Sequence, residues 1–267
     1  GKDFTASFDN TTGLITTYVY GGKTVLTEGP TPNYWRARVD NDGDSLDTKW
    51  QTANKSMKLD GFQVKIADDG KSAVVTASIK LPGANNSVQK MTYTVYSTGE
   101  ITIKADLQPG EGMGQMLRYG AELTLPIDYE NITWYGNGPQ ETYQDRKQGS
   151  QVGVYETTVF DSFFPFVRPQ DSGNHTDVRY MALESDKSDV GLMVVGSDVL
   201  EAGALYWNAK ELITTHTDLN KRHPYQLAKP SHTVLHVDYK SRGLGSNSCG
   251  PQPLDQYILP GNQSYSY

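Results

Sequence analysis

The chain has 267 residues with 36% hydrophobic residues and 26 glycines, the composition of a turn-rich globular protein. Its formal net charge of −7 argues against a nucleic-acid partner, because phosphate binding needs a basic face. With a single cysteine, Cys249, the chain cannot form an intrachain disulfide. No apolar run is long enough to predict a membrane-spanning segment, so we expect no membrane partner. The chain begins with neither methionine nor a signal peptide, and we expect it to be cut from a longer polypeptide or partnered with one.

Alternating apolar and polar residues predict β-strands along most of the chain. Residues 14–20 and 23–26 flank Gly21-Gly22, a two-residue turn that predicts a hairpin. Two more hairpins are predicted, over 62–81 around Asp69-Gly70 and over 90–107 around Thr98-Gly99. Further strands are predicted at 119–127, 190–196, 203–208 and 233–239.

Helical periodicity is nearly absent. Only 45–59 could form a helix, with Ser45 as N-cap and with Trp50 and Met57 facing inward. At this length one large all-β domain is possible, and we predict a single two-layer antiparallel domain over 1–267. Its longest loops are predicted at 136–152, 161–178 and 217–232. Long loops on a rigid sheet often carry function.

The sequence contains no metal-binding pattern. The five histidines are scattered, without paired cysteines or an HExxH motif. Asp40, Asp42 and Asp44 alternate, but Gln51 stands where an EF-hand that starts at Asp40 would need a bidentate glutamate. We therefore interpret this segment as a cluster of Asx turns that caps the possible helix.

Two loops are dense in polar and aromatic residues. The stretch "GNGPQETYQDR" at 136–146 is either a turn that an Asp145–Arg146 pair ties down or part of a site. The stretch at 163–180 is either a loop held by stacked phenylalanines and an Asp177–Arg179 pair or one wall of a sugar cleft. Composition alone does not decide between these interpretations.

Four stretches together resemble the C-terminal β domain of the LacZ-type bacterial β-galactosidases of glycoside hydrolase family 2. "YWRARVDND" is similar to that domain's WRAP-x-DND signature, and "WYGNGPQETYQDR" to its W-x-G-x-GP-x-E-x-Y-x-DR loop. "FPFVRPQDSGNHTDVR" and "VDYKSRGLGSNSCGP" are similar to two later motifs of the family, and the resemblance covers 1–267. Departures from the family pattern are Arg38 for proline, Asp171 for glutamate and His175 for arginine.

The resemblance implies a large antiparallel supersandwich, similar in fold to the aldose (galactose) mutarotases. It also implies that 138–147 is a mobile active-site loop, whose candidate site residues are Gly138, Glu141, Tyr143, Asp145 and Arg146. Asn247, Ser248 and Cys249 would bind substrate in the sugar pocket. A tryptophan that stacks on the substrate occupies the Cys249 position in some members, and cysteine in others.

The family places its two catalytic glutamates, with magnesium and sodium sites, on a TIM barrel, and this chain lacks the strand–helix alternation of such a barrel. The resemblance therefore implies that this chain is a non-catalytic part of a retaining β-galactosidase and is inactive alone. The full enzyme would act on a galactoside substrate, would contain the barrel as this chain's partner, and would be a homo-oligomer in the bacterial cytoplasm or periplasm. Alternatives are a stand-alone carbohydrate-binding module and an aldose-1-epimerase-like protein, for which His175 and Glu141 would be the acid and the base.

Overall fold

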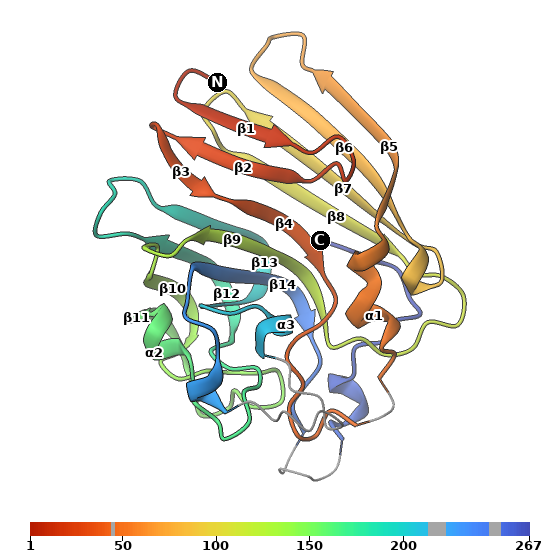
Figure 1. Ribbon diagram of the computed structural model, residues 1–267, viewed down its shortest axis with the longest axis vertical. Coiled ribbons are helices and arrows are strands. Elements are labelled where there is room, and N and C mark those ends of the chain that lie inside the picture. Colours follow the sequence, from red (N-terminus) through yellow and green to blue (C-terminus); the bar gives the residue numbers. More distant parts are fainter. Residues whose placement is uncertain (44–45, 213–222, 246–251) are drawn as a thin grey trace.

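The computed structural model describes residues 1–43, 46–212, 223–245 and 252–267, and it is built almost entirely from antiparallel strands (Figure 1). The strands are β1 (Phe4–Phe8), β2 (Ile15–Tyr20), β3 (Lys23–Leu26), β4 (Glu28–Asn33), β5 (Lys58–Ile66), β6 (Ser72–Leu81), β7 (Ser87–Tyr96), β8 (Ile101–Gln108), β9 (Arg118–Pro126), β10 (Asn131–Gly138), β11 (Gln151–Thr158), β12 (His175–Glu184), β13 (Leu192–Leu205), β14 (His232–Ser241) and β15 (Tyr265–Ser266). The helical elements are α1 (Lys49–Thr52), α2 (Val159–Ser162), α3 (Ala209–Leu212) and the 3₁₀ turns η1 (Ala53–Ser56), η2 (Pro82–Ala84), η3 (Pro224–Gln226) and η4 (Asp255–Tyr257).

The strands form three sheets, with orders β1-β2-β3, β11-β10-β12-β13-β14-β9-β4 and β15-β8-β7-β6-β5. All three predicted hairpins are confirmed, as β2–β3, β5–β6 and β7–β8. Gly21 and Gly22 have φ angles of 55° and 77°, the left-handed conformation that a tight two-residue hairpin turn needs at both positions. The predicted all-β antiparallel class is confirmed.

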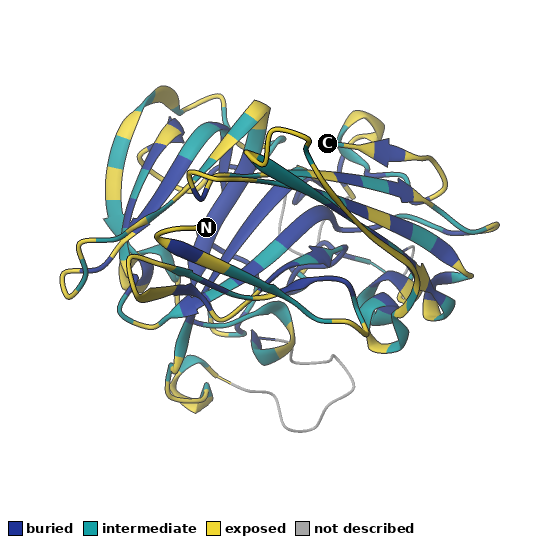
Figure 2. Cartoon of the chain, turned by 90° about the horizontal axis from the view of Figure 1, so that it is seen from above, coloured by how far each residue is buried: buried dark blue, intermediate teal, exposed yellow. Residues whose placement is uncertain are grey.

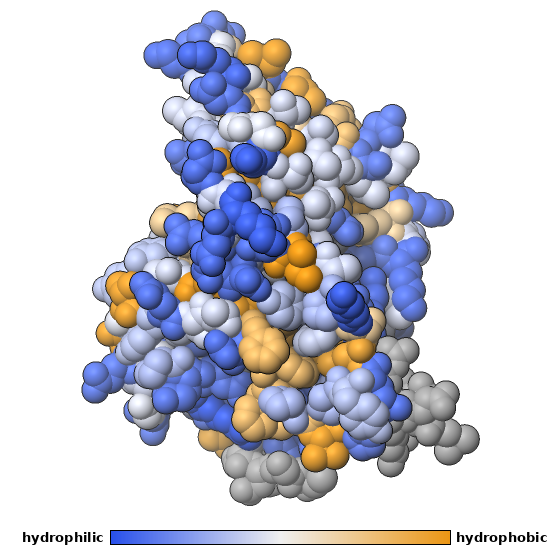
Figure 3. Space-filling model, turned by 60° about the vertical axis from the view of Figure 1, so that its left-hand side comes forward, coloured by the Kyte–Doolittle hydropathy of each residue, from blue (hydrophilic) through white to orange (hydrophobic). Residues whose placement is uncertain are grey.

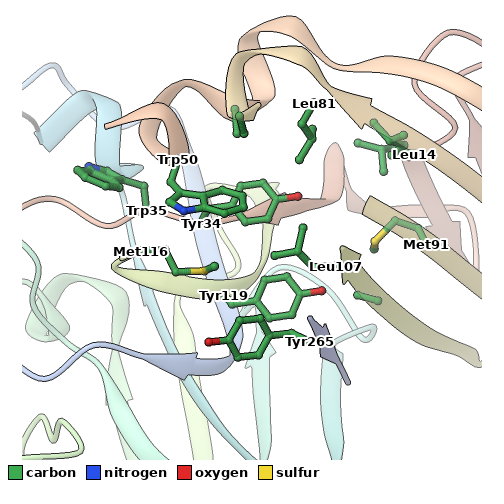
Figure 4. Packing of buried hydrophobic residues seen from close by; sticks show 14 of the residues in the cluster. Leu14, Tyr34, Trp35, Trp50, Leu81, Met91, Leu107, Met116, Tyr119 and Tyr265 are labelled. Carbon is green, nitrogen blue, oxygen red and sulfur yellow. The ribbon is translucent and has the colours of Figure 1, made fainter. Parts of the chain in front are cut away.

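Both smaller sheets pack on the seven-stranded sheet. One buried cluster joins the five-stranded sheet to β9 and α1, and it contains Tyr34, Trp50, Tyr119 and Tyr265 beside Leu107 and Met116 (Figure 4). The other cluster joins the three-stranded sheet, through Phe4 and Val25, to the inner face of the seven-stranded sheet. Figure 2 shows that buried residues gather on the strands in the middle of the molecule.

Two local predictions were wrong. The helix predicted over 45–59 is only one turn of α-helix, α1, followed by the turn η1, and Leu59 already belongs to β5. Trp50 is buried as expected, but the N-cap is Thr48, and Ser45 lies outside the described residues. The strands predicted at 190–196 and 203–208 are one long strand, β13, because irregular pairing with β12 lets a single strand continue through Ser197 and Asp198. No helix in the described part of the chain is long and apolar enough to span a membrane.

Candidate functional site

The four family-like stretches, far apart in the sequence, lie against one another over the outer face of the seven-stranded sheet. Asp171 donates its backbone N–H to the Ala37 carbonyl at 3.2 Å, and Thr142 donates to the Asn174 carbonyl at 2.7 Å. Asn41 reaches the carbonyl of Leu244 at 3.0 Å. We call residues 36–43, 138–147, 171–177 and 241–245 the loop cluster. Nothing local in the sequence brings these segments together.

A fully buried ion triad fixes the first and last segments of the loop cluster. Asp42 lies 3.2 Å from Arg36 and 2.8 Å from Arg242, and no part of the three side chains is exposed. Asp42 also accepts the backbone N–H of Val39 at 2.9 Å, as in a tight turn. Asp40 instead pairs with Arg168 at the surface, and Asp44 lies outside the described residues. Asp42 thus anchors the loop cluster to 242 and does not cap a helix.

Tyr143 connects the predicted active-site loop to the sheet beneath it. It is buried, and its hydroxyl donates to Asp171 Oδ2 at 3.1 Å. Asp171 pairs with Arg118 of β9 at 3.2 Å, and Arg118 Nε lies 3.1 Å from Asp238 of β14. Tyr143 is therefore a supporting residue under the loop, with its hydroxyl committed to a buried carboxylate.

Asp238 and His236 complete this buried chain of polar groups. His236 Nδ1 lies 2.7 Å from Asp238 Oδ2, and both residues are buried. Burial raises the pKa of Asp238 to about 7 and lowers the pKa of His236 well below its usual value. The imidazole is therefore neutral near pH 7 and donates its Nδ1–H to Asp238, which fixes the orientation of the ring.

Asp145 and Arg146 do not pair with each other, as the turn interpretation of this loop would require, and both hold the neighbouring segment. The carboxylate of Asp145 accepts the backbone N–H groups of Leu244 at 3.0 Å and Gly245 at 2.8 Å. Arg146 donates to the Gly245 carbonyl at 2.7 Å. The predicted loop therefore lies beside the segment that leads to Asn247, Ser248 and Cys249, and these three candidate residues lie outside the described residues.

Gly138 ends β10 at a point of close approach. A Cβ atom at this position would lie 2.6 Å from Tyr155 Cδ2 and 3.0 Å from Trp134 Cζ2. Real Cβ atoms do not come that near another carbon, so only glycine fits without a shift of the rings. Gly138 belongs to a strand, and its side-chain position faces two packed aromatic rings.

The residues considered for an epimerase, His175 and Glu141, do not form an acid–base pair. His175 is buried and stacks on Trp134 with ring centroids 3.9 Å apart, and burial lowers its pKa to about 4. Glu141 lies at the exposed rim and accepts the Gly173 N–H at 2.8 Å. His175 is therefore a neutral core residue near pH 7, and no described hydrogen bond joins it to Glu141.

The side chains of Asp177 and Arg179 do not form the pair that the held-loop interpretation of 163–180 includes. The carboxylate of Asp177 lies 3.0 Å from Lys147 Nζ and accepts the side-chain amide of Asn137 at 2.7 Å. Arg179 contacts the backbone carbonyl of Asp177 instead. Asp177 has φ 53°, and its side chain points to the end of the 138–147 loop, so the carboxylate ties that loop to β12.

A small cavity opens between β9, β14 and α3, beside the loop cluster. Its wall includes Arg118, Glu122, His236, Trp207 and Asn208. Its volume of about 20 Å³ is enough for roughly one water molecule and far too small for a sugar ring. The Glu122 side chain makes no hydrogen bond or ion pair with another described residue, and burial raises the pKa of its carboxyl to about 7. Among the described residues, no group of three His, Cys, Asp or Glu side chains could hold a metal ion.

Sequence reasoning missed most of the buried polar residues under the loop cluster. Buried Arg118 and Glu201 and half-buried Glu122 were not singled out, and His236 was named only as one of the scattered histidines. The sequence does contain a signal for these residues, namely ionisable residues spaced by even numbers within a strand. His236 and Asp238 are two residues apart in "TVLHVDY", and Arg118 and Glu122 are four apart in β9, so each pair lies on one face of its strand. Such charges on a strand without turn signals indicate a polar face that other segments cover.

The chain is similar over its whole length to longer proteins named beta-galactosidase. It is 33% identical to the one from Priestia megaterium and 29% identical to the one from Halalkalibacterium halodurans, over 100% of this chain and 25% and 26% of theirs. The protein of Lactobacillus delbrueckii subsp. bulgaricus is 32% identical over 79% of this chain and 21% of its own. This chain therefore spans about a quarter of the length of these curated relatives.

Solved structures show likeness of fold at low sequence identity. A TPR-domain containing protein from Parabacteroides distasonis superimposes with a TM-score of 0.51 and 11% identity, over 100% of this chain and 44% of that chain. An aldose epimerase homologue from C. elegans gives a TM-score of 0.47 and 12% identity, over 99% of this chain and 93% of that chain. The model of the beta galactosidase small chain family matches residues 1–267, and this chain therefore belongs to that family.

Proposed function

We propose that this chain is the non-catalytic C-terminal β domain of a retaining β-galactosidase of glycoside hydrolase family 2. The substrates would be terminal β-D-galactosides such as lactose. Membership of the small chain family over 1–267 supports the proposal. So does the length of the relatives named beta-galactosidase, which is about four times that of this chain.

Within that enzyme, we assign the loop cluster to one wall of the galactoside site. The observation that carries this assignment is the contact of Asp145 and Arg146 with Leu244 and Gly245. These three bonds hold 138–147 and the segment leading to 247–249 at a fixed distance from each other. Two segments coupled in this way can shape one sugar pocket together, which is the role that the family resemblance predicts for them.

The reaction itself is assigned to another part of the enzyme. A retaining glycosidase needs two carboxylates about 5–5.5 Å apart, one as acid/base and one as nucleophile. In the loop cluster, Asp42 and Asp171 are each paired with a buried arginine, so their carboxylate oxygens already serve ion pairs that hold the fold. We propose that both catalytic glutamates, with the magnesium and sodium sites, belong to a (β/α)₈ barrel in the rest of the polypeptide.

Arg146→Ala in the full polypeptide tests the proposed wall. The change removes the bond to Gly245 but leaves the buried triad intact, so melting should stay nearly constant while kcat/KM for an aryl galactoside falls about tenfold or more, the scale of a misplaced positioning group. Arg179→Ala is the matched control, because Arg179 also donates to one backbone carbonyl but does not contact 244–245. Equal kcat/KM in the two variants would exclude Arg146 from a role in the site.

The chain alone, residues 1–267, should not hydrolyse a chromogenic galactoside. Turnover by the isolated chain that disappears when one of its own carboxylates is replaced would contradict the assignment of the chemistry to another part. This measurement is independent of the Arg146 test, because it does not depend on how the loop cluster contacts substrate.

A further inference from the structure

One sheet edge of this chain lacks the features that usually prevent strands from pairing with other chains. The three sheets end on six edge strands within the described residues. An edge strand exposes unpaired backbone N–H and C=O groups, and proteins usually protect it by shortness, proline, charged side chains or a bulge.

Five of the edges are protected. β15 has two residues and β3 has four. β4 carries Pro30 and Pro32, β5 carries Lys58, Asp60 and Lys65, and the pairing of β1 is irregular between Ser7 and Phe8. Each of these edges is a poor template for a strand from another molecule.

The edge strand β11 has none of these protections. Its sequence, QVGVYETT, extends for eight residues without proline, lysine or arginine, and Glu156 is its one charged residue. It pairs with β10 without a register shift from Gln151 to Thr158. On the outer face, Val152 is 47% exposed and Val154 is 59% exposed. In Figure 1, β11 lies at the margin of the seven-stranded sheet.

The apolar character continues from this edge across the outer face of the sheet. Val154 lies opposite Tyr135, which lies opposite Tyr180, which in turn lies opposite Val195. Outer faces of antiparallel sheets are normally polar when water covers them. The space-filling view in Figure 3 shows separate hydrophobic groups among hydrophilic ones on the side of the molecule that it displays.

We propose that β11 pairs antiparallel with β11 of a second copy of this chain, around a two-fold axis at Gly153. A two-fold contact requires a strand that complements itself, because each residue meets the residue equally far from the axis. Here Val152 meets Val154 of the second copy, and Gln151 meets Tyr155. Glu156 meets Ser150, so that no two like charges are opposed. The central Val152-Gly153-Val154 segment of this contact thus reads the same in both directions, as a two-fold pairing of identical strands requires.

A cysteine-pair experiment in the full polypeptide tests both the contact and its register. The variant carries Val152→Cys and Val154→Cys in a Cys249→Ser background, which places each new thiol opposite the other one in the second copy. Directly opposed residues of an antiparallel pair have Cβ atoms about 4.5–5.5 Å apart, so a local shift of about 1 Å brings the two sulfurs within bonding distance. Mild oxidation should give mainly a disulfide-linked dimer on a non-reducing gel. Val64→Cys with Ile66→Cys on the protected edge β5 is the control, because Val64 and Ile66 together are at least as exposed as Val152 and Val154. This variant should stay monomeric on the gel.

Hydrogen exchange on the unmodified polypeptide provides a second measurement that does not depend on a variant's folding. In the paired state the outward amides of β11 are protected, and this protection should fall as the protein is diluted. Val154→Lys should weaken the pairing by more than about tenfold, because it adds a charge of the kind that protects natural edges. Absence of the disulfide-linked dimer, or concentration-independent exchange in β11, would refute the proposal, whether the edge is free or covered by another part of the same polypeptide.

Discussion

Gly138 offers the sharpest test of how the 138–147 loop begins. Replacing it with alanine adds one methyl group at a position where Tyr155 Cδ2 would be 2.6 Å away and Tyr155 Cε2 2.8 Å away. Gly138 does not have a positive φ, so the backbone itself tolerates alanine. The cost of Gly138→Ala is therefore purely the displacement of the aromatic rings.

The loss of unfolding free energy in Gly138→Ala depends on how easily the neighbouring aromatic rings can move. The Tyr155 ring is partly exposed and can shift, while Trp134 is buried and stacked on His175 and cannot. Inserting a methyl group into such packing costs about 1–3 kcal/mol of unfolding free energy. For a chain of this size that corresponds to a fall in melting temperature of roughly 2–4 °C for each kcal/mol.

Urea unfolding of four variants measures this cost. Gly149→Ala, in the same loop region, is the control, because no atom lies within 4 Å of its added Cβ, and it should be neutral or slightly stabilising. In a Tyr155→Ala background the cost of Gly138→Ala should fall by about 1 kcal/mol or more, since the obstructing ring is gone. If Gly138→Ala is as harmless as Gly149→Ala, or equally costly with and without the Tyr155 ring, the steric argument is wrong.

Three further predictions concern the buried polar groups. Asp42→Ala leaves two arginines buried without their carboxylate and should cost about 3–5 kcal/mol in urea unfolding, whereas Asp40→Ala at the surface should cost less than about 1 kcal/mol. Burial raises the pKa of Glu122 to about 7, so between pH 4.5 and 7 the folded chain keeps a proton that the unfolded chain has lost. The stability that this group contributes is therefore present at low pH and is lost as the pH rises to about 7. Glu122→Gln should therefore match the unmodified chain near pH 4.5 and exceed its stability by at most about 3 kcal/mol at pH 8, and a gain that is the same at both pH values would contradict this. Tyr143→Phe removes a hydrogen bond to the Asp171 carboxylate and should cost about 1.5–3 kcal/mol, and a cost near zero in thermal melts would show that water replaces the hydroxyl.

The predictable part of the fold was the part that local chemistry determines. The three hairpins follow from short turns such as Gly21-Gly22, in which neighbouring residues alone set the conformation. The helix over 45–59 is shorter than predicted because the α-helical turn gives way to a 3₁₀ turn at Ala53, and at the end of the segment Leu59 pairs with Ile79 of β6. Tertiary contacts decided that segment.

The candidate site was predictable only in outline. The resemblance selected the 138–147 loop, but the partners of its charged residues depend on contacts about 100 residues away, as from Asp145 to Leu244. Pairing of sequence neighbours, which the sequence suggested for Asp145 with Arg146 and for Asp177 with Arg179, was wrong in both instances. Charged neighbours on an irregular segment point in different directions, and the segments packed around them supply their partners.

The Arg36–Asp42–Arg242 triad can form only late in the synthesis of this chain. Arg36 bonds to the backbone of a residue 206 positions later. At usual elongation rates of about 5–20 residues per second, the ribosome needs roughly 10–40 s to make the intervening stretch. During that interval Asp42 has one arginine partner, and the loop cluster lacks its last segment. A nascent chain that stops before Arg242 can contain every strand except β15 and still lack the arginine that completes the triad.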